Sequence, residues 1–186
     1  MEVLITIIVL ALMGSAFISA SEASIIAVNR VRIKNLSDQG NKKAAAVQKT
    51  LEENEKFFGT LLLFGNLLNV LIATLVGTLI INLFGEGGFT SVIIATAIST
   101  IIVVTFGELT PKSISTRIAD KWSLLVINII RTLMLISGPA VWTFTLVPKI
   151  ITKTFLKSTI EENPVVTTGE LRTLIDLEEE EGTVES

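Results

Sequence analysis

Four long runs of residues carry almost no charge, and they constrain the fold more than any other feature of this sequence. Residues 3–21, 57–85 and 87–107 contain no Asp, Glu, Lys or Arg, and residues 123–148 contain only Arg131. A helix needs roughly 20 apolar residues to cross about 30 Å of hydrocarbon, and each run is close to that length or exceeds it. The chain of 186 residues, 49% of them hydrophobic, is therefore predicted to be an all-α membrane protein.

The first run lies where a secretion signal would lie, but its composition differs from one. Met1 and Glu2 precede it in place of a basic segment, and it is longer than the apolar part of a signal. We expect it to be retained as a membrane span.

The positions of Lys and Arg predict an orientation. Residues 29–56 contain seven of them, and the positive-inside rule places such a segment in the cytoplasm. We expect this segment to be partly helical, with a turn at Gly40 and Asn41. The N-terminus and the glycine-rich turn at 85–88 are then outside, and the third run returns to a second basic segment at 112–121. We expect a multi-pass protein of the plasma membrane with a cytoplasmic C-terminus.

The fourth run has two interpretations. If it crossed the bilayer, Lys149, Lys153 and Lys157 would lie outside, against the rule. Gly138 and Pro139 also interrupt it, and proline removes a helical hydrogen bond. We predict three crossings followed by a kinked juxtamembrane helix that lies like a belt along the cytoplasmic face. Four crossings is the alternative.

Charge divides the chain into two parts. Residues 161–186 hold nine Asp and Glu and one Arg, whereas residues 1–160 hold nine acids and fourteen Lys and Arg. We interpret residues 1–160 as a transmembrane domain and residues 161–186 as a linker and the beginning of an acidic helical bundle. A basic membrane domain with an acidic tail argues against nucleic acid as a partner.

The chain contains no Cys and no His. Thiol chemistry and the usual zinc, copper and haem ligands are therefore excluded. No base and nucleophile pair is evident in the spans, so we expect no enzymatic activity. Oxygen ligands remain, and these suit hard cations such as Mg²⁺, Ca²⁺ and Na⁺.

Two clusters of polar residues interrupt the first and second runs. Ser15, Ser19 and Glu22 share one helix face, where the serines serve either close helix packing or cation ligation. In the second run Asn66 and Asn69 are neighbours on one face, and they serve either an interhelical hydrogen bond or a ligand site.

The third cluster is residues 107–112, with the sequence GELTPK. Pro111 has no N–H, so the Gly107 carbonyl loses its helical donor beside the Glu108 carboxylate. We expect the helix to break there and a new helix to begin at Pro111 with Thr110 as its N-cap. The alternative role for Glu108 is a pair with Lys112 at a helix end facing water. Taken together, the three clusters predict a hard-cation site assembled from three spans.

The same residues resemble the transmembrane domain of the CNNM (cyclin M) and CorC family of magnesium transport proteins. The matching segments are residues 17–23 (FISASEA), 65–69 (GNLLN) and 107–112 (GELTPK), in that order, and the resemblance covers essentially all of residues 1–160. It implies a homodimer in the lipid bilayer with three membrane helices per chain and a belt helix. In the family a pair of CBS modules that bind ATP follows the segment corresponding to this sequence.

The resemblance also implies a function and a site. The function is Mg²⁺ efflux, with exchange against Na⁺ as one form of it; the alternative is a membrane-embedded Mg²⁺ sensor or scaffold that binds the ion without moving it. Neighbouring serines leave open which one in the first span is a ligand. The implied metal ligands are Ser15, Ser19, Gly65, Asn66, Asn69 and Glu108, and the residues that shape the site are Glu22, Gly107, Pro111 and Lys112.

Overall fold

The computed structural model describes residues 1–84 and 88–155, and every element in this part of the chain is helical. The elements are α1 (Glu2–Ala27), α2 (Arg30–Asp38), α3 (Lys42–Glu52), α4 (Asn54–Phe84), α5 (Gly88–Ile102), the π-helix η1 (Val103–Leu109), α6 (Thr110–Arg117) and α7 (Ala119–Phe155). The predicted all-α fold is confirmed. The predicted turn at 85–88, except for Gly88, and the predicted linker and acidic bundle at 161–186 lie outside the described residues.

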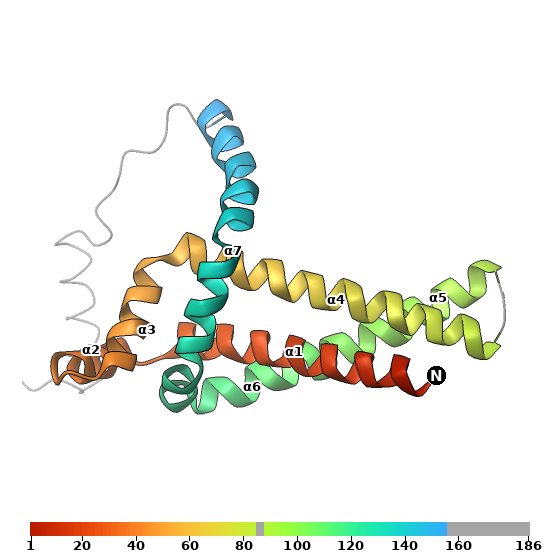
Figure 1. The fold of residues 1–186 in the computed structure, drawn as a ribbon, viewed down its shortest axis with the longest axis horizontal. Helices are drawn as coiled ribbons and strands as arrows, with labels where there is room; N and C mark the ends of the chain where they lie inside the picture. The colour runs from red at the N-terminus through yellow and green to blue at the C-terminus, as the bar shows by residue number, and fades with distance from the viewer. Residues whose placement is uncertain (85–87, 156–186) are drawn as a thin grey trace, which may run out of the picture. The chain divides into compact units, whose positions relative to one another are not determined.

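Three long helical rods form the centre of the structure. The first two rods are α1 and α4, and the third is α5, η1 and α6 joined end to end. Helix α1 packs against α4 and against the η1 and α6 parts of the third rod. Figure 1 shows α1 and α4 running side by side, with α6 against α1. The third rod changes partner along its length, because α5 packs on α4 whereas η1 and α6 pack on α1.

Two buried apolar clusters hold the rods together. One joins α1, α4, α5 and η1 and includes Ile8, Ile72 and Val103. The other joins α1, the start of α4, and α7, and it includes Ile25 and Ile127, neither of which has any exposed surface. Between helices in a bilayer the lipid tails are as apolar as these side chains, so close van der Waals packing rather than exclusion of water holds the helices together.

The predicted basic segment folds into the short helices α2 and α3, which pack on each other. Asn29 caps α2 by accepting from the Arg32 amide, and Asn41 caps α3 by accepting from the Ala44 amide. Gly40, between the helices, has a φ of +86°, a conformation that glycine adopts readily. The expected turn at residues 40–41 is therefore confirmed.

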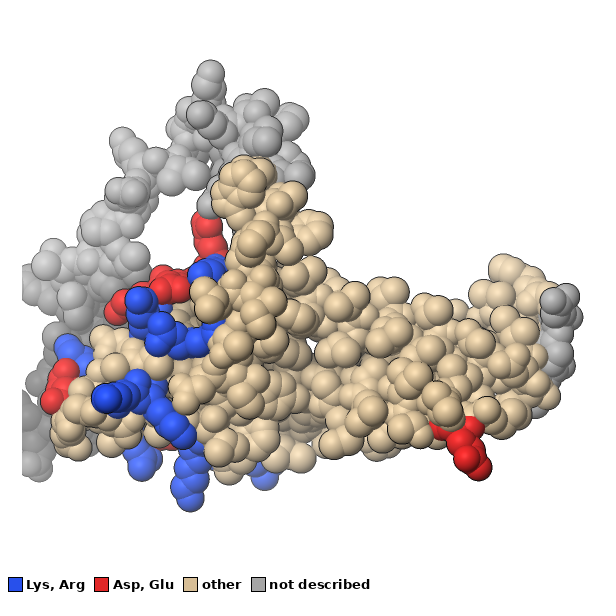
Figure 2. Space-filling model, viewed as in Figure 1, with Lys and Arg blue, Asp and Glu red and all other residues tan. Residues whose placement is uncertain are grey.

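The outward faces of the rods are apolar. Large exposed side chains include Leu10 and Met13 on α1, Leu67 and Val70 on α4, and Val92 on α5. Figure 2 shows that Lys and Arg gather at the α2–α3 end, while the surface along the rods is almost free of charge. Such a surface matches hydrocarbon and would be unfavourable in water, so the chain is a multi-pass membrane protein.

Four helices in the described part of the chain, not three, are long and apolar enough to span a bilayer. The fourth is Ala119–Phe144. Gly138 and Pro139 do not divide the fourth run into two helices, because α7 continues through both residues. A helix tolerates one proline when it loses only the hydrogen bond to the carbonyl four residues earlier and neighbouring contacts hold the segment. The predicted count of three therefore does not follow from length and composition alone.

Small residues bring α7 against the start of α4. A β-carbon built on Gly59 would lie 2.6 Å from Cγ1 of Val141. Thr60 follows Gly59, and Ser137 lies one turn before Val141. The buried hydroxyls of Thr60 and Ser137 form a hydrogen bond of 2.9 Å. Residues 1–146 form one compact unit, which contains all of these contacts.

Candidate cation site

The three polar clusters predicted from sequence meet at one place in the structure. Helix α1 supplies Ser15, Ser19 and Glu22, and α4 supplies Gly65, Asn66 and Asn69. The third rod supplies Gly107 and Glu108 from η1, and Lys112 from α6. The heptad-like spacing on α1 and the i, i+3 spacing on α4 place these side chains on the faces where the helices meet.

A chain of two hydrogen bonds links the three rods. The Ser15 hydroxyl donates to Oδ1 of Asn69 at 2.8 Å, and Nδ2 of Asn69 donates to Oε1 of Glu108 at 2.8 Å. Ser15 is 1% exposed, so water does not compete for its bond. Asn69 is thus both the interhelical bridge expected as one alternative and the partner that a carboxylate at membrane depth requires.

Lys112 pairs with Glu22 rather than with Glu108. Its Nζ lies 2.8 Å from Oε2 of Glu22, and this ion pair joins α6 to α1. The alternative that Lys112 neutralises Glu108 is therefore not what the structure shows. The Glu108 carboxyl group is instead oriented by the Asn69 amide.

A cavity of about 210 Å³ lies beside this network. Two acidic groups and one basic group line it, so its formal charge is −1. The lining residues are Ile18, Ser19, Glu22, Leu61, Leu62, Gly65, Asn66, Asn69, Glu108 and Lys112. Seven predicted site residues thus share one cavity. Ser15 and Gly107 are not among the lining residues, and Ser15 connects to the cavity through Asn69.

Gly107 allows the third rod to approach α1. A β-carbon at this position would lie 3.1 Å from the Ser15 hydroxyl oxygen and 3.5 Å from Cδ1 of Leu12. Gly107 is itself buried. The absence of a side chain therefore sets the distance between η1 and α1, and it keeps Ser15 within reach of Asn69.

The expected helix break is instead a π-helical stretch. The third rod continues from Gly88 to Arg117, and Thr110 has helical dihedral angles rather than those of an N-cap. The Thr110 amide donates to the Thr105 carbonyl, five residues back. A π-helical stretch retains the helical direction while changing its hydrogen-bond partners, which is why no break is needed.

Pro111 and the π-helix together change the donors available to two carbonyl groups. The Gly107 carbonyl lacks its donor four residues on because Pro111 has no N–H. The Phe106 carbonyl loses the Thr110 amide to Thr105, and its donor five residues on is again Pro111. The sequence indicated the first of these carbonyls but not the second, since no residue pattern in it marks a π-helix.

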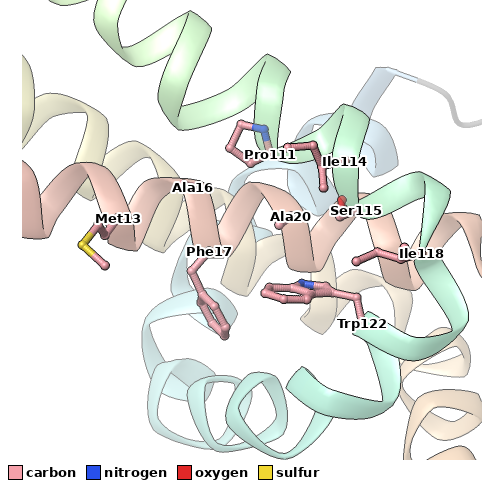
Figure 3. A pocket seen from close by; sticks show the side chains of 9 residues that line it. All are labelled: Met13, Ala16, Phe17, Ala20, Pro111, Ile114, Ser115, Ile118 and Trp122. Atoms are coloured by element: carbon pink, nitrogen blue, oxygen red, sulfur yellow. The ribbon is translucent and has the colours of Figure 1, made fainter.

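Pro111 itself faces away from the polar cavity. Its ring lines a separate apolar cavity of about 330 Å³ between α1, α6 and α7, with Phe17 and Trp122 among its neighbours (Figure 3). The predicted shaping role of Pro111 is therefore exerted through the backbone. Its side chain contributes to packing.

The chemistry of the site is that of mixed oxygen donors. Within residues 1–84 and 88–155, no group of three or more His, Cys, Asp or Glu side chains is placed to hold a metal ion. The cavity instead offers one oriented carboxylate, amide oxygens and the Ser19 hydroxyl. Oxygen donors of this kind suit hard cations.

Comparison with known proteins identifies relatives along nearly the whole chain. Residues 6–186 match the family described as the cyclin M transmembrane N-terminal domain, which confirms the resemblance seen in the sequence. A UPF0053 protein of Haemophilus influenzae is 29% identical over 178 residues, 94% of this chain and 41% of its own length. A UPF0053 inner membrane protein of Escherichia coli is 29% identical over 163 residues, which are 87% of this chain and 37% of the relative. The chain therefore spans about two fifths of the length of these curated relatives.

Proposed function

Since this chain belongs to the cyclin M (CNNM) transmembrane domain family, which supports a transport-related role, we propose that it carries Mg²⁺ across the membrane. The observation that carries the proposal is the Ser15–Asn69–Glu108 network beside a polar cavity, in rods whose outer surface is apolar. Charged and amide groups at membrane depth cost free energy, and they are retained where they serve an ion pathway.

The geometry provides the charge and the ligands that a divalent cation needs. Glu108 supplies a negative charge whose direction is set by Asn69, and Ser19, Asn66 and the Gly65 carbonyl add neutral oxygens around the same cavity. Mg²⁺ gives up its water reluctantly, so several protein oxygens must replace water together or the ion must enter hydrated. The cavity of about 210 Å³ accommodates an ion with part of its water shell.

The small formal charge of the site also suits exchange. With one carboxylate at its centre and a second one neutralised by Lys112, the cavity attracts monovalent as well as divalent cations. Na⁺ can therefore take the place of Mg²⁺ after release, and efflux of Mg²⁺ coupled to entry of Na⁺ is the form of transport that we propose.

Flux through the purified protein tests this proposal. In proteoliposomes holding a Mg²⁺ indicator, we expect Mg²⁺ movement that protein-free liposomes lack and that an opposing Na⁺ gradient accelerates. Measurement of Mg²⁺ binding on the same preparation distinguishes a transporter from a sensor that binds Mg²⁺ without moving it. Binding without any flux would assign the chain to the sensor class instead.

The proposed orientation places the basic α2–α3 end in the cytoplasm, with the N-terminus outside. The plasma membrane as location is supported by the name of the Escherichia coli relative, an inner membrane protein. A homodimer and a belt role for α7 follow from the resemblance. Under this arrangement α7 lies at the cytoplasmic surface although its composition would allow it to span.

Cysteine labelling checks the orientation, because the chain has no Cys of its own. We expect Asn41→Cys and Lys153→Cys both to react with a membrane-impermeant maleimide only from the cytoplasmic side. Glu86→Cys, in the segment that the sequence predicts to lie outside, is the matched control and should react only from outside. Labelling of position 153 from outside would establish four crossings and end the belt interpretation.

A further inference from the structure

A third hollow, separate from the cation cavity and from the apolar cavity beside Pro111, lies between the α3–α4 junction and α7. Its volume is about 520 Å³. It is lined by Lys49, Glu53, Lys56, Asn128, Arg131, Thr132, Met134 and Leu135. None of these residues lines the cation cavity, so the two cavities share no side chain.

The hollow gathers positive charge from three separate segments of the chain. Lys49 is on α3, Lys56 on α4 and Arg131 on α7, and only Glu53 opposes them. Glu53 contacts Lys49 at 3.9 Å, a long distance for an ion pair. Within the described residues, the side chains of Lys56 and Arg131 have neither an ion pair nor a hydrogen bond.

The two unpaired cations occupy positions where a bound anion would be favourable. Lys56 is in the first turn of α4, where the helix dipole repels positive charge. Arg131 is the single charge in the apolar run 123–148. A cation in such a run costs free energy unless it meets water, a headgroup or a counter-ion. An anion held between Lys56 and Arg131 would remove both penalties.

The remaining lining residues narrow the chemistry of that anion. A guanidinium and two ammonium groups form the donor set that binds phosphate oxygens, with arginine binding two of them at once. Asn128 adds an exposed side-chain amide at the same edge. Met134 and Leu135 supply an apolar wall next to the charges, as a phosphate attached to acyl chains would require.

We propose that this hollow binds a phosphate group through Lys49, Lys56 and Arg131. An anionic phospholipid headgroup and a soluble phosphate compound share that chemistry. The apolar wall and the membrane-facing helices favour the lipid as the source. Binding there would tie α7 to the α3–α4 junction, since the basic groups belong to all three helices.

The test uses the whole chain and measures retained lipid. Purified protein is exchanged from phosphatidylglycerol or from phosphatidylcholine of the same acyl chains into clean detergent, and native mass spectrometry counts the bound lipid. A third arm titrates inorganic phosphate and follows thermal stability. The variant is Lys56→Gln with Arg131→Gln, and the matched control is Arg30→Gln with Lys43→Gln, which removes the same charge from exposed positions outside the hollow.

We expect the wild type and the control to retain phosphatidylglycerol over phosphatidylcholine, and the variant to bind it about tenfold more weakly. If inorganic phosphate raises the thermal stability of the wild type but not of the variant, the same phosphate site is supported, with a soluble phosphate compound as its ligand. Equal behaviour of variant and control in all three arms would overturn the proposal. Circular dichroism and size-exclusion chromatography verify that each variant is folded, and the single change Lys56→Gln replaces the pair if the pair is not.

Discussion

Glu108→Gln is expected to abolish Mg²⁺ binding and Mg²⁺ flux while leaving the fold intact. The glutamine amide has nearly the shape of the carboxylate and can still accept from Nδ2 of Asn69, so the contact between α4 and η1 survives. The negative charge that draws the cation is lost. In the wild type, Mg²⁺ at 100 times its dissociation constant should raise the free energy of unfolding by about 2.7 kcal/mol. The variant should gain almost nothing, which thermal unfolding with and without Mg²⁺ measures.

The control for this experiment must lose a carboxylate elsewhere. Glu52→Gln on α3 is a suitable control, because Glu52 is exposed and does not line the cation cavity. Glu22→Gln does not serve, since it would leave Lys112 without its partner inside the same cavity. A Glu108→Gln protein that is stabilised by Mg²⁺ as strongly as wild type would show that the cation binds at another place.

Gly107→Val should disrupt the site by steric means and lower stability as well. A β-carbon at position 107 already lies 3.1 Å from the Ser15 oxygen, and the branched side chain adds two more atoms there. Overpacking of this kind typically costs about 1–3 kcal/mol. Because η1 must move away from α1, the bond from Ser15 to Asn69 is expected to break and Mg²⁺ binding to weaken with it.

Gly77→Val separates this effect from the general effect of valine in a helix. Gly77 is also helical, but nothing lies within 4 Å of a β-carbon built on it. We expect Gly77→Val to melt and bind Mg²⁺ like the wild type. If the two valine variants lose the same stability and the same Mg²⁺ binding, close approach at Gly107 is not what holds the site together.

Much of the fold could be predicted because membrane helices depend on local composition. The uncharged runs located the long helices, and Gly40 with Asn41 located the turn between α2 and α3. The polar residues of the site could also be found, since a hydroxyl, amide or carboxylate in an apolar run is conspicuous and needs a partner. Their helical spacing indicated the shared faces.

The partners themselves could not be predicted. Which group pairs with Glu108 depends on how α1, α4 and η1 pack. Sequence spacing alone offered the neighbour Lys112 as an alternative and did not identify the distant Asn69 as the partner. Proline also carries an ambiguous signal. Pro111 accompanies a π-helix where sequence reasoning expected a break, whereas Pro139 lies within a continuous helix. Packing decides whether a helix continues past a missing donor.

The π-helical stretch has a consequence for the rod that contains it. A regular α-helix turns by about 100° per residue, so one extra residue accommodated in a wide turn rotates everything beyond it relative to the side chains before it. Helix α5 therefore presents one stripe to α4, and α6 presents a different stripe to α1, although both belong to one unbroken rod. The π-helix η1 works as a rotational offset, and Glu108 and Lys112 owe their direction to it as much as to their place in the sequence.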